Sequence, residues 1–257
     1  MLAASLLLLT VLIAFGVTAM RRVGWARSPQ TSARPSRRPL ALVEVPEEVR
    51  AFFQRAESAH TQTIGILPLD VERCGIYSAQ IRGFDPAFEA LGLIALDDSN
   101  NSNPYCYITA GPATGMVMLV RHDDAPEIRF ASLDRFMDAL ARAKQDERRF
   151  EFEDFEPVPP LADQEGLRAF LLALADRDDE LSEGLIGVLV PLLLPEASQV
   201  YERLSTHPSL WVRESVAITM SKHPLRVHEF AAIRLSQDHY PQVARPAKSV
   251  LAAIAAS

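Results

Sequence analysis

Residues 207–217 read HPSLWVRESVA, and within and after them Val212, Val216 and Met220 follow one another at four-residue spacing. That spacing places the three side chains on one face of a helix. The same apolar positions recur 31 residues earlier and 31 residues later, as Leu181, Leu185 and Leu189 and as Val243, Ala247 and Leu251. A period of this length predicts a stack of similar helical units.

The helix that precedes each of these helices repeats with the same period. Its apolar positions are Ala169, Phe170 and Ala173, then Val200, Tyr201 and Leu204, then Ala231, Ala232 and Leu235. We therefore predict three helix pairs, over about 164–194, 196–222 and 226–256. One pair cannot bury its own apolar face, whereas three stacked pairs can. Residues 161–257 are thus expected to form an all-α helical repeat.

The middle unit resembles a HEAT-like repeat, whose second helix begins with a pattern like that of residues 207–217. The third unit keeps Val243 but has its arginine one position later, and the first unit has no arginine beside Leu181. The resemblance implies a concave surface that binds proteins, which is an analogy at the level of the fold.

Upstream of the repeat, residues 44–145 are predicted to form an α+β domain with a mostly antiparallel sheet. Pro46 and the two glutamates after it favour a helix start. The apolar face of that helix consists of Val49, Phe52, Phe53 and Ala56. We expect short strands at 64–67 and 76–81, and a short helix at 86–91.

The centre of this domain has the pattern of a hairpin. Residues 105–109 and 116–120 predict two strands, because they flank the Gly/Pro turn at 111–115. Residues 128–130 predict a further strand, after which Ser132 can cap a helix. The apolar stripe of that helix consists of Leu133, Phe136, Met137, Leu140 and Ala141.

These blocks carry a resemblance to a known superfamily. The blocks are Val45-Pro46-Glu47-Glu48-Val49 with Phe52-Phe53, residues 93–98, the strand ending in His122-Asp123-Asp124, and residues 130–140. Together they resemble the SUKH superfamily, which includes yeast cell-wall synthesis regulators and bacterial immunity proteins of polymorphic toxin systems. The resemblance implies a protein-binding domain without enzymatic activity and, in bacteria, the neutralisation of a toxin. Residues 61–83 depart from the usual pattern.

The N-terminus carries an apolar run over residues 2–20, which as a helix would be about 28 Å long and could cross a membrane. All of its flanking positive charge follows it, which favours a single-span anchor within residues 1–20 and a body in the cytoplasm. Val17-Thr18-Ala19 also fits a cleavage site, so export after signal cleavage is the alternative. We expect residues 21–43, rich in Arg, Ser and Pro, and the acidic, proline-rich residues 146–160 to be linkers.

Charge is unevenly distributed along the 257 residues, whose formal net charge is -7. Residues 1–43 contain six arginines and no acidic residue, so residues 44–257 carry a charge of -13. An acidic body argues against nucleic-acid binding and suits a basic protein partner, such as a nuclease toxin. The two cysteines exclude a disulfide scaffold and a multi-cysteine metal site, and we expect no metal and no cofactor.

Polar and aromatic residues at the predicted strand ends are the candidate partner-binding surface. They are Asp97, Asp98, Asn101, Tyr105, His122 and Asp123. The alternative is an ordinary solvated turn. A hydrolase would instead need Cys106 as the nucleophile, His122 as its base and Asp123 to orient the base. A trio of these residue types arises by chance in most chains.

The leading expectation is therefore a non-enzymatic, membrane-anchored protein that binds another protein, with toxin neutralisation as the role that the SUKH resemblance implies. The alternative is a membrane-tethered scaffold that binds its partners through the helical repeats.

Overall fold

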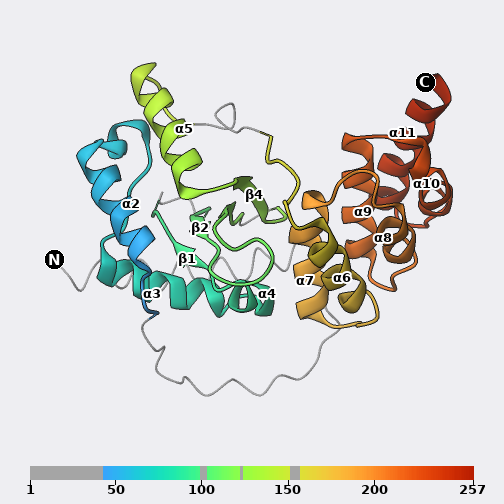
Figure 1. Cartoon of the computed structure of the whole chain (residues 1–257), viewed down its shortest axis with the longest axis horizontal. Coiled ribbons are helices and arrows are strands. Elements are labelled where there is room, and N and C mark those ends of the chain that lie inside the picture. The colour runs from blue at the N-terminus through green and yellow to red at the C-terminus, as the bar shows by residue number, and fades with distance from the viewer. Residues whose placement is uncertain (1–42, 99–102, 122–123, 151–156) are drawn as a thin grey trace.

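The computed structural model is an α+β protein, and it describes residues 43–98, 103–121, 124–150 and 157–257. Figure 1 shows a first part that contains one sheet, followed along the longest axis by a part made of helices alone. We call these parts the sheet half (residues 43–150) and the helical half (residues 157–257).

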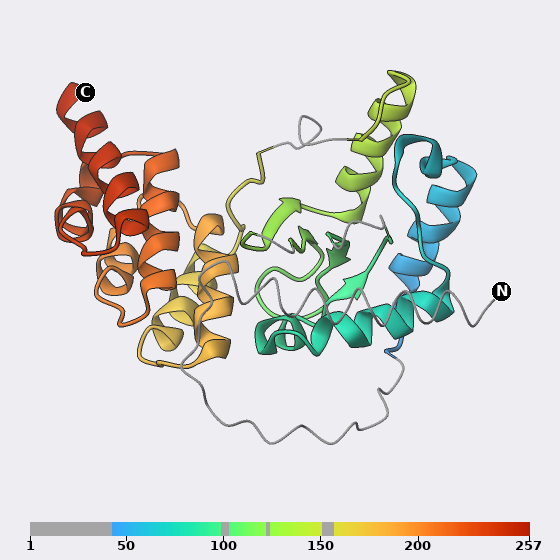
Figure 2. The same cartoon turned by 180° about the vertical axis from the view of Figure 1, so that it is seen from behind.

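The sheet half surrounds a four-stranded antiparallel sheet in the order β1-β2-β3-β4. Its strands are β1 (Ile94–Ala95), β2 (Tyr105–Tyr107), β3 (Val117–Leu119) and β4 (Glu127–Phe130). Its helices are α2 (Glu47–Ser58), η1 (Thr61–Ile64), α3 (Val71–Arg82), α4 (Pro86–Ala90) and α5 (Leu133–Gln145). Helices α3 and α4 run in line along one side of the sheet, whereas α2 and α5 lie side by side at the end far from the helical half (Figures 1 and 2).

Several predicted elements of the sheet half are confirmed. The hairpin is present as β2 and β3, which pair Tyr105 with Leu119, and both Gly111 and Gly115 of its turn have positive φ angles. Ser132 caps α5 by accepting a hydrogen bond from the Arg135 backbone N–H at 3.2 Å. The predicted helix at 86–91 is α4, and the predicted strand at 128–130 is part of β4.

Two predicted strands are wrong. Residues 76–81 lie inside helix α3, which Asp70 caps by accepting a hydrogen bond from the Arg73 N–H at 2.8 Å. Residues 64–67 begin at the end of η1 and continue into extended chain that forms only one isolated bridge, from Pro68 to Asp97. The two hydrogen bonds of this bridge are donated by the Leu69 N–H to the Leu96 carbonyl at 3.2 Å and by the Asp98 N–H to the Leu67 carbonyl at 2.9 Å, and the extended chain ends where Asp70 caps α3.

The helical half alternates helices in the predicted order. They are α6 (Gln164–Leu174), α7 (Glu180–Leu189), η3 (Val190–Leu192), α8 (Ser198–Leu204), α9 (Leu210–Lys222), η4 (Arg226–His228), α10 (Glu229–Ser236) and α11 (Pro241–Ala256). The predicted alignment is wrong for α6, in which Ala169 and Ala173 are exposed. The residues of α6 that are buried are Leu167, Leu171 and Leu174. Leucines bury more apolar area than alanines, so they occupy the core in place of Ala169 and Ala173. Leu171 and Leu174 lie 30 residues before Tyr201 and Leu204 of α8.

One continuous hydrophobic core runs through both halves. Phe150, within the predicted linker 146–160, packs against this core, and its ring centroid lies 5.9 Å from that of Phe136. Among the residues that the structure describes, no helix is both long enough and apolar enough to cross a membrane. The predicted anchor lies outside them, because the description begins at residue 43.

Candidate binding face where the two halves meet

Helix α4 packs against helix α7, and this contact joins the two halves. Ala87 of α4 is 1% exposed, and a Cβ placed on Gly184 of α7 would lie 2.7 Å from the Ala87 Cβ. That separation is well below the roughly 3.5–4.0 Å at which carbon atoms attract, so only a glycine fits here. Asp85 caps α4 by accepting a hydrogen bond from the Ala87 N–H at 2.7 Å, and its carboxylate also lies beside α7.

Acidic residues of both halves lie close in sequence to the two residues of this contact, Ala87 and Gly184. The loop between α6 and α7, residues 175–179, leads into the N-terminal end of α7 (Figures 1 and 2). Together with Phe84, the acidic residues define a surface that we call the junction face: Phe84, Asp85 and Glu89 in the sheet half, and Asp178, Glu180 and Glu183 in the helical half. Within the described residues, Glu89, Asp178 and Glu183 form no ion pair, although the charge of Glu89 acts on the nearby Arg82 guanidinium.

Phe84 supplies the apolar part of the junction face. It follows α3 in a turn in which its N–H donates to the Ile81 carbonyl at 3.1 Å, and it is 50% exposed. A half-exposed aromatic ring beside charged groups is the composition of many protein-binding surfaces, where such rings contribute most of the binding energy.

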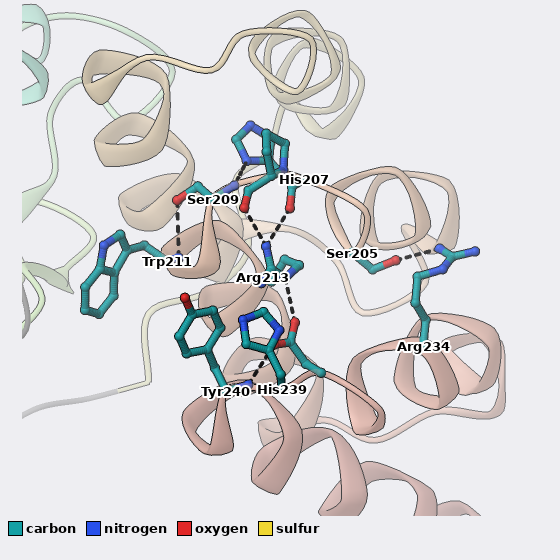
Figure 3. Close-up of polar contacts among 10 residues, drawn as sticks. Ser205, His207, Ser209, Trp211, Arg213, Arg234, His239 and Tyr240 are labelled. Atoms are coloured by element: carbon teal, nitrogen blue, oxygen red, sulfur yellow. Dashed lines mark hydrogen bonds and ion pairs between the residues drawn. The ribbon is translucent and has the colours of Figure 1, made fainter. Parts of the chain in front are cut away.

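The units of the helical half are held together by arginines that reach between them. Arg213 of α9 donates to Asp238 Oδ2 at 2.6 Å and to the carbonyls of His207 and Pro208 at 2.9 and 2.7 Å (Figure 3). Arg234 of α10 donates to Ser205 Oγ at 2.8 Å. The bonds from Arg213 to Asp238 and from Arg234 to Ser205 cross from the middle helix pair to the last one, whereas the bonds to His207 and Pro208 stay within the middle pair.

Two buried histidines make similar links. His207 and His228 are each 1% exposed, and each has one ring nitrogen against a carbonyl of the preceding unit, that of Arg177 at 3.0 Å and that of Pro195 at 2.6 Å. The other ring nitrogen of each accepts a backbone N–H, so both rings are neutral. Burial lowers the pKa of His228, which agrees with this assignment.

A separate cavity of about 200 Å³ lies between β4 and the helical half. Its walls are mostly apolar and proline-rich, and Tyr201 and His228 lie at its inner side. Charged groups also line it, since Glu127 pairs with Arg129 at 2.5 Å and with Lys222 at 3.9 Å. The lining thus holds one carboxylate against two cationic side chains, and these charged groups sum to +1.

The structure buries two residues of the predicted partner-binding surface. Asp97 is fully buried, and its Oδ1 accepts a hydrogen bond from the Tyr105 backbone N–H at 2.7 Å. Burial raises the pKa of Asp97 to about 7. Tyr105 is 7% exposed, and its ring packs 4.8 Å from that of Phe136. Both residues therefore support the β1–β2 connection from inside and do not offer their side chains to a partner.

Of the other four residues of the predicted partner-binding surface, the structure describes one. Asp98 keeps a partly exposed carboxylate and pairs with Arg73 at 2.9 Å. Asn101, His122 and Asp123 lie outside the described residues. Among the residues of the predicted surface that the structure describes, Asp98 is therefore the one whose side chain is partly exposed.

Both cysteines are buried thiols. Cys106 is fully buried in β2, and burial raises its pKa well above the usual value, which disfavours the thiolate that a nucleophile requires. Cys74 in α3 donates to the Ala95 carbonyl at 3.2 Å, and burial raises its pKa to about 11. The thiols thus sit in apolar surroundings that keep them protonated.

The junction face was missed at the level of the sequence. The signals for its parts were present: Phe84 stands between a glycine and an aspartate, and residues 176–180 read DRDDE. No local sequence pattern could show that these two segments are close in space, because Ala87 and Gly184, which are in contact, are almost one hundred residues apart in the chain.

Comparison with protein-family models, with curated proteins and with solved structures found no match to this chain. Among the residues that the structure describes, no group of three or more His, Cys, Asp or Glu side chains is arranged to hold a metal ion.

Proposed function

We propose that this protein binds a basic protein partner through the junction face. The observation that carries the proposal is that α4 and α7 meet at Ala87 and Gly184, with the Asp85 carboxylate beside α7, in chain segments that also hold further acidic residues and the half-exposed ring of Phe84. Opposite charge would speed the encounter and orient the partner, and burial of the aromatic ring would hold it. The acidic balance of residues 44–257 acts in the same direction.

In the SUKH-like setting the partner would be a toxin, and binding would neutralise it by covering its active site. The N-terminal run over residues 2–20 would attach the protein to a membrane, with the body in the cytoplasm. Neither step requires chemistry from the chain itself, so the proposed function is that of a binding protein and not of an enzyme.

The test uses the full chain, because the two halves share one core and are not expected to fold separately. A photo-crosslinking amino acid at position 84 should capture a basic protein in cells of the source organism. Reversing two junction-face charges, with Glu89→Lys and Asp178→Lys, should weaken binding of the captured protein by about tenfold, with a smaller effect at high salt.

The matched control reverses two other exposed acids, with Glu57→Lys on α2 and Asp138→Lys on α5. Both are exposed and lie far from the junction face, and the change in net charge is identical. Equal weakening by the two double variants would mean that only net charge matters and would contradict the proposal. So would the absence of any adduct at position 84.

The scaffold alternative is favoured by one observation, the arginine contacts that fasten the helix pairs into a single array. A crosslinker at Ile218, which is 41% exposed on α9, tests it. A partner captured from position 218 and not from position 84 would replace the junction face with the helical repeat as the binding surface.

A further inference from the structure

The last unit of the helical half exposes apolar side chains that the middle unit does not. Val227, Phe230 and Ile233 are 45%, 76% and 43% exposed, and we call these three residues the α10 patch. The positions 31 residues earlier, which are also exposed, are occupied by Glu196, Gln199 and Glu202. At these three positions, exposed apolar groups are therefore a property of the last unit and not of the repeat pattern.

The α10 patch lies on the open side of its helix. The opposite side of α10 is buried through Ala231, Ala232 and Leu235. In Figure 1 α10 lies at the outer end of the helical half, away from the sheet half. The described part of the chain therefore supplies nothing that covers Phe230.

The α10 patch lies at the basic end of an acidic molecule. Residues 210–257 have a net charge of +3, whereas residues 44–209 have a net charge of -16. Arg226 lies in η4, directly before α10, and precedes Phe230 by four residues. Arg226 is exposed and, within the described residues, has no ion-pair partner.

We infer that the α10 patch docks on an anionic membrane surface. An exposed aromatic ring with two aliphatic side chains, in a region of net positive charge, is the composition of segments that lie in the interface of anionic bilayers. The charge distribution would turn this end toward the lipid, because the rest of the molecule is repelled by it.

A protein partner fits the α10 patch less well than lipid does. Three side chains expose far less than the about 800 Å² per partner that a stable protein interface buries. A second copy related by a two-fold axis would also bring one Arg226 toward the other, so like charges would meet. The inference does not depend on the junction face, which lies on other helices.

The experiment places an environment-sensitive fluorophore beside the α10 patch in the full chain. Gln237→Cys provides an exposed thiol, and both native thiols are fully buried, so labelling is selective. The labelled protein is mixed with phosphatidylcholine vesicles that contain either no or about 30% phosphatidylserine. At equal amounts of bound protein, the emission should shift to the blue and rise about twofold or more only with the anionic vesicles.

A matched pair of substitutions tests the surface itself. Ile233→Ser should abolish most of the emission change, whereas Ile218→Ser should retain it, since the two isoleucines are 43% and 41% exposed. Phe230→Ser should have the largest effect, and Arg226→Glu should weaken the response to phosphatidylserine. Unchanged thermal unfolding of each variant shows that folding is intact.

Three results would overturn the inference. The first is an equal emission change with both kinds of vesicle, which would assign the signal to attachment elsewhere in the chain. The second is a response that survives Phe230→Ser. The third is an emission change that grows with protein concentration in the absence of vesicles, which would assign the α10 patch to a second copy.

Discussion

The Asp97 carboxyl is a proton-binding group in the core of the sheet half. Its Oδ1 accepts the Tyr105 N–H, and its Oδ2 has no hydrogen-bond partner among the described residues. Desolvation raises its pKa from 3.8 to about 7, although the hydrogen bond from Tyr105 acts in the other direction. The folded protein therefore binds a proton that the unfolded chain has already released, and the contribution of Asp97 to stability is lost as the pH rises from about 4 to about 7.

We predict that Asp97→Asn stabilises the protein at alkaline pH. Asparagine keeps the acceptor for the Tyr105 N–H and removes the buried negative charge. The free energy of unfolding in urea should exceed that of the wild type by on the order of 2–4 kcal/mol near pH 8, and the gain should vanish near pH 4. Asp138→Asn, at an exposed acid, should change little. A gain that is the same at both pH values would contradict this account.

Asp97 also shows why sequence reasoning identified the loop but misjudged its residues. Residues 97–104 are nearly all turn formers, and such a run is usually exposed. The burial of Asp97 comes from the chain near Pro68, which crosses over it and forms the isolated bridge. A contact between segments so far apart leaves no trace in the local pattern.

At the scale of elements, the helices that were recognised bury large apolar residues at helical spacing. Helix α3 was mistaken for a strand because its buried face is small, consisting of Cys74, Gly75, Ser78, Ala79 and Ile81. Small side chains let α3 approach β1 closely enough for Ser78 Oγ to accept the Ala95 N–H at 2.9 Å. The small residues that such close packing requires do not form the stripe of large apolar residues by which a helix is recognised in a sequence.

The Arg213–Asp238 pair, which joins α9 to the loop between α10 and α11, is expected to be strongly coupled. The two side chains are 13% and 7% exposed, so Arg213→Ala would leave a buried carboxylate without its cation and cost about 3 kcal/mol. A double-mutant cycle in urea with Asp238→Ala should show losses well below additivity. The control cycle is Arg203 with Asp176, a pair with exposed side chains whose coupling should be below about 1 kcal/mol. Equal coupling in the two cycles would disprove the role of burial.

At the scale of the molecule, the α4–α7 contact should make the two halves unfold together. Gly184→Ala would force a Cβ to within 2.7 Å of Ala87, whereas a Cβ at Gly187 would first meet Ser215 Oγ at an ordinary 3.7 Å. Both glycines lie inside α7, where alanine alone should add about 0.5–1 kcal/mol. We predict that Gly187→Ala raises the unfolding midpoint and Gly184→Ala lowers it.

Calorimetry distinguishes the outcomes of this pair. The wild type and Gly187→Ala should each unfold in one transition, because one core serves both halves. Gly184→Ala should also unfold in one transition, at a lower midpoint than the wild type. If Gly184→Ala behaved like Gly187→Ala, the two helices would not be in the contact described.

The organisation into a sheet-containing part and a helical part was predictable, because each part has its own periodicity. Their union was not, since it depends on a glycine in α7 and an alanine in α4 whose importance appears only when the helices are placed side by side. The same holds for the junction face, whose acids come from both parts.

The opposite charges of the two ends affect whether two ligands can bind to this protein at the same time. At physiological salt the screening length is about 8 Å, whereas a compact body of this many residues has a radius of gyration of about 17 Å. The -16 region and the +3 end are therefore electrostatically independent over most of their separation. A ligand on one end hardly alters the field at the other, so the molecule can carry two oppositely charged ligands at once without either one displacing or recruiting the other.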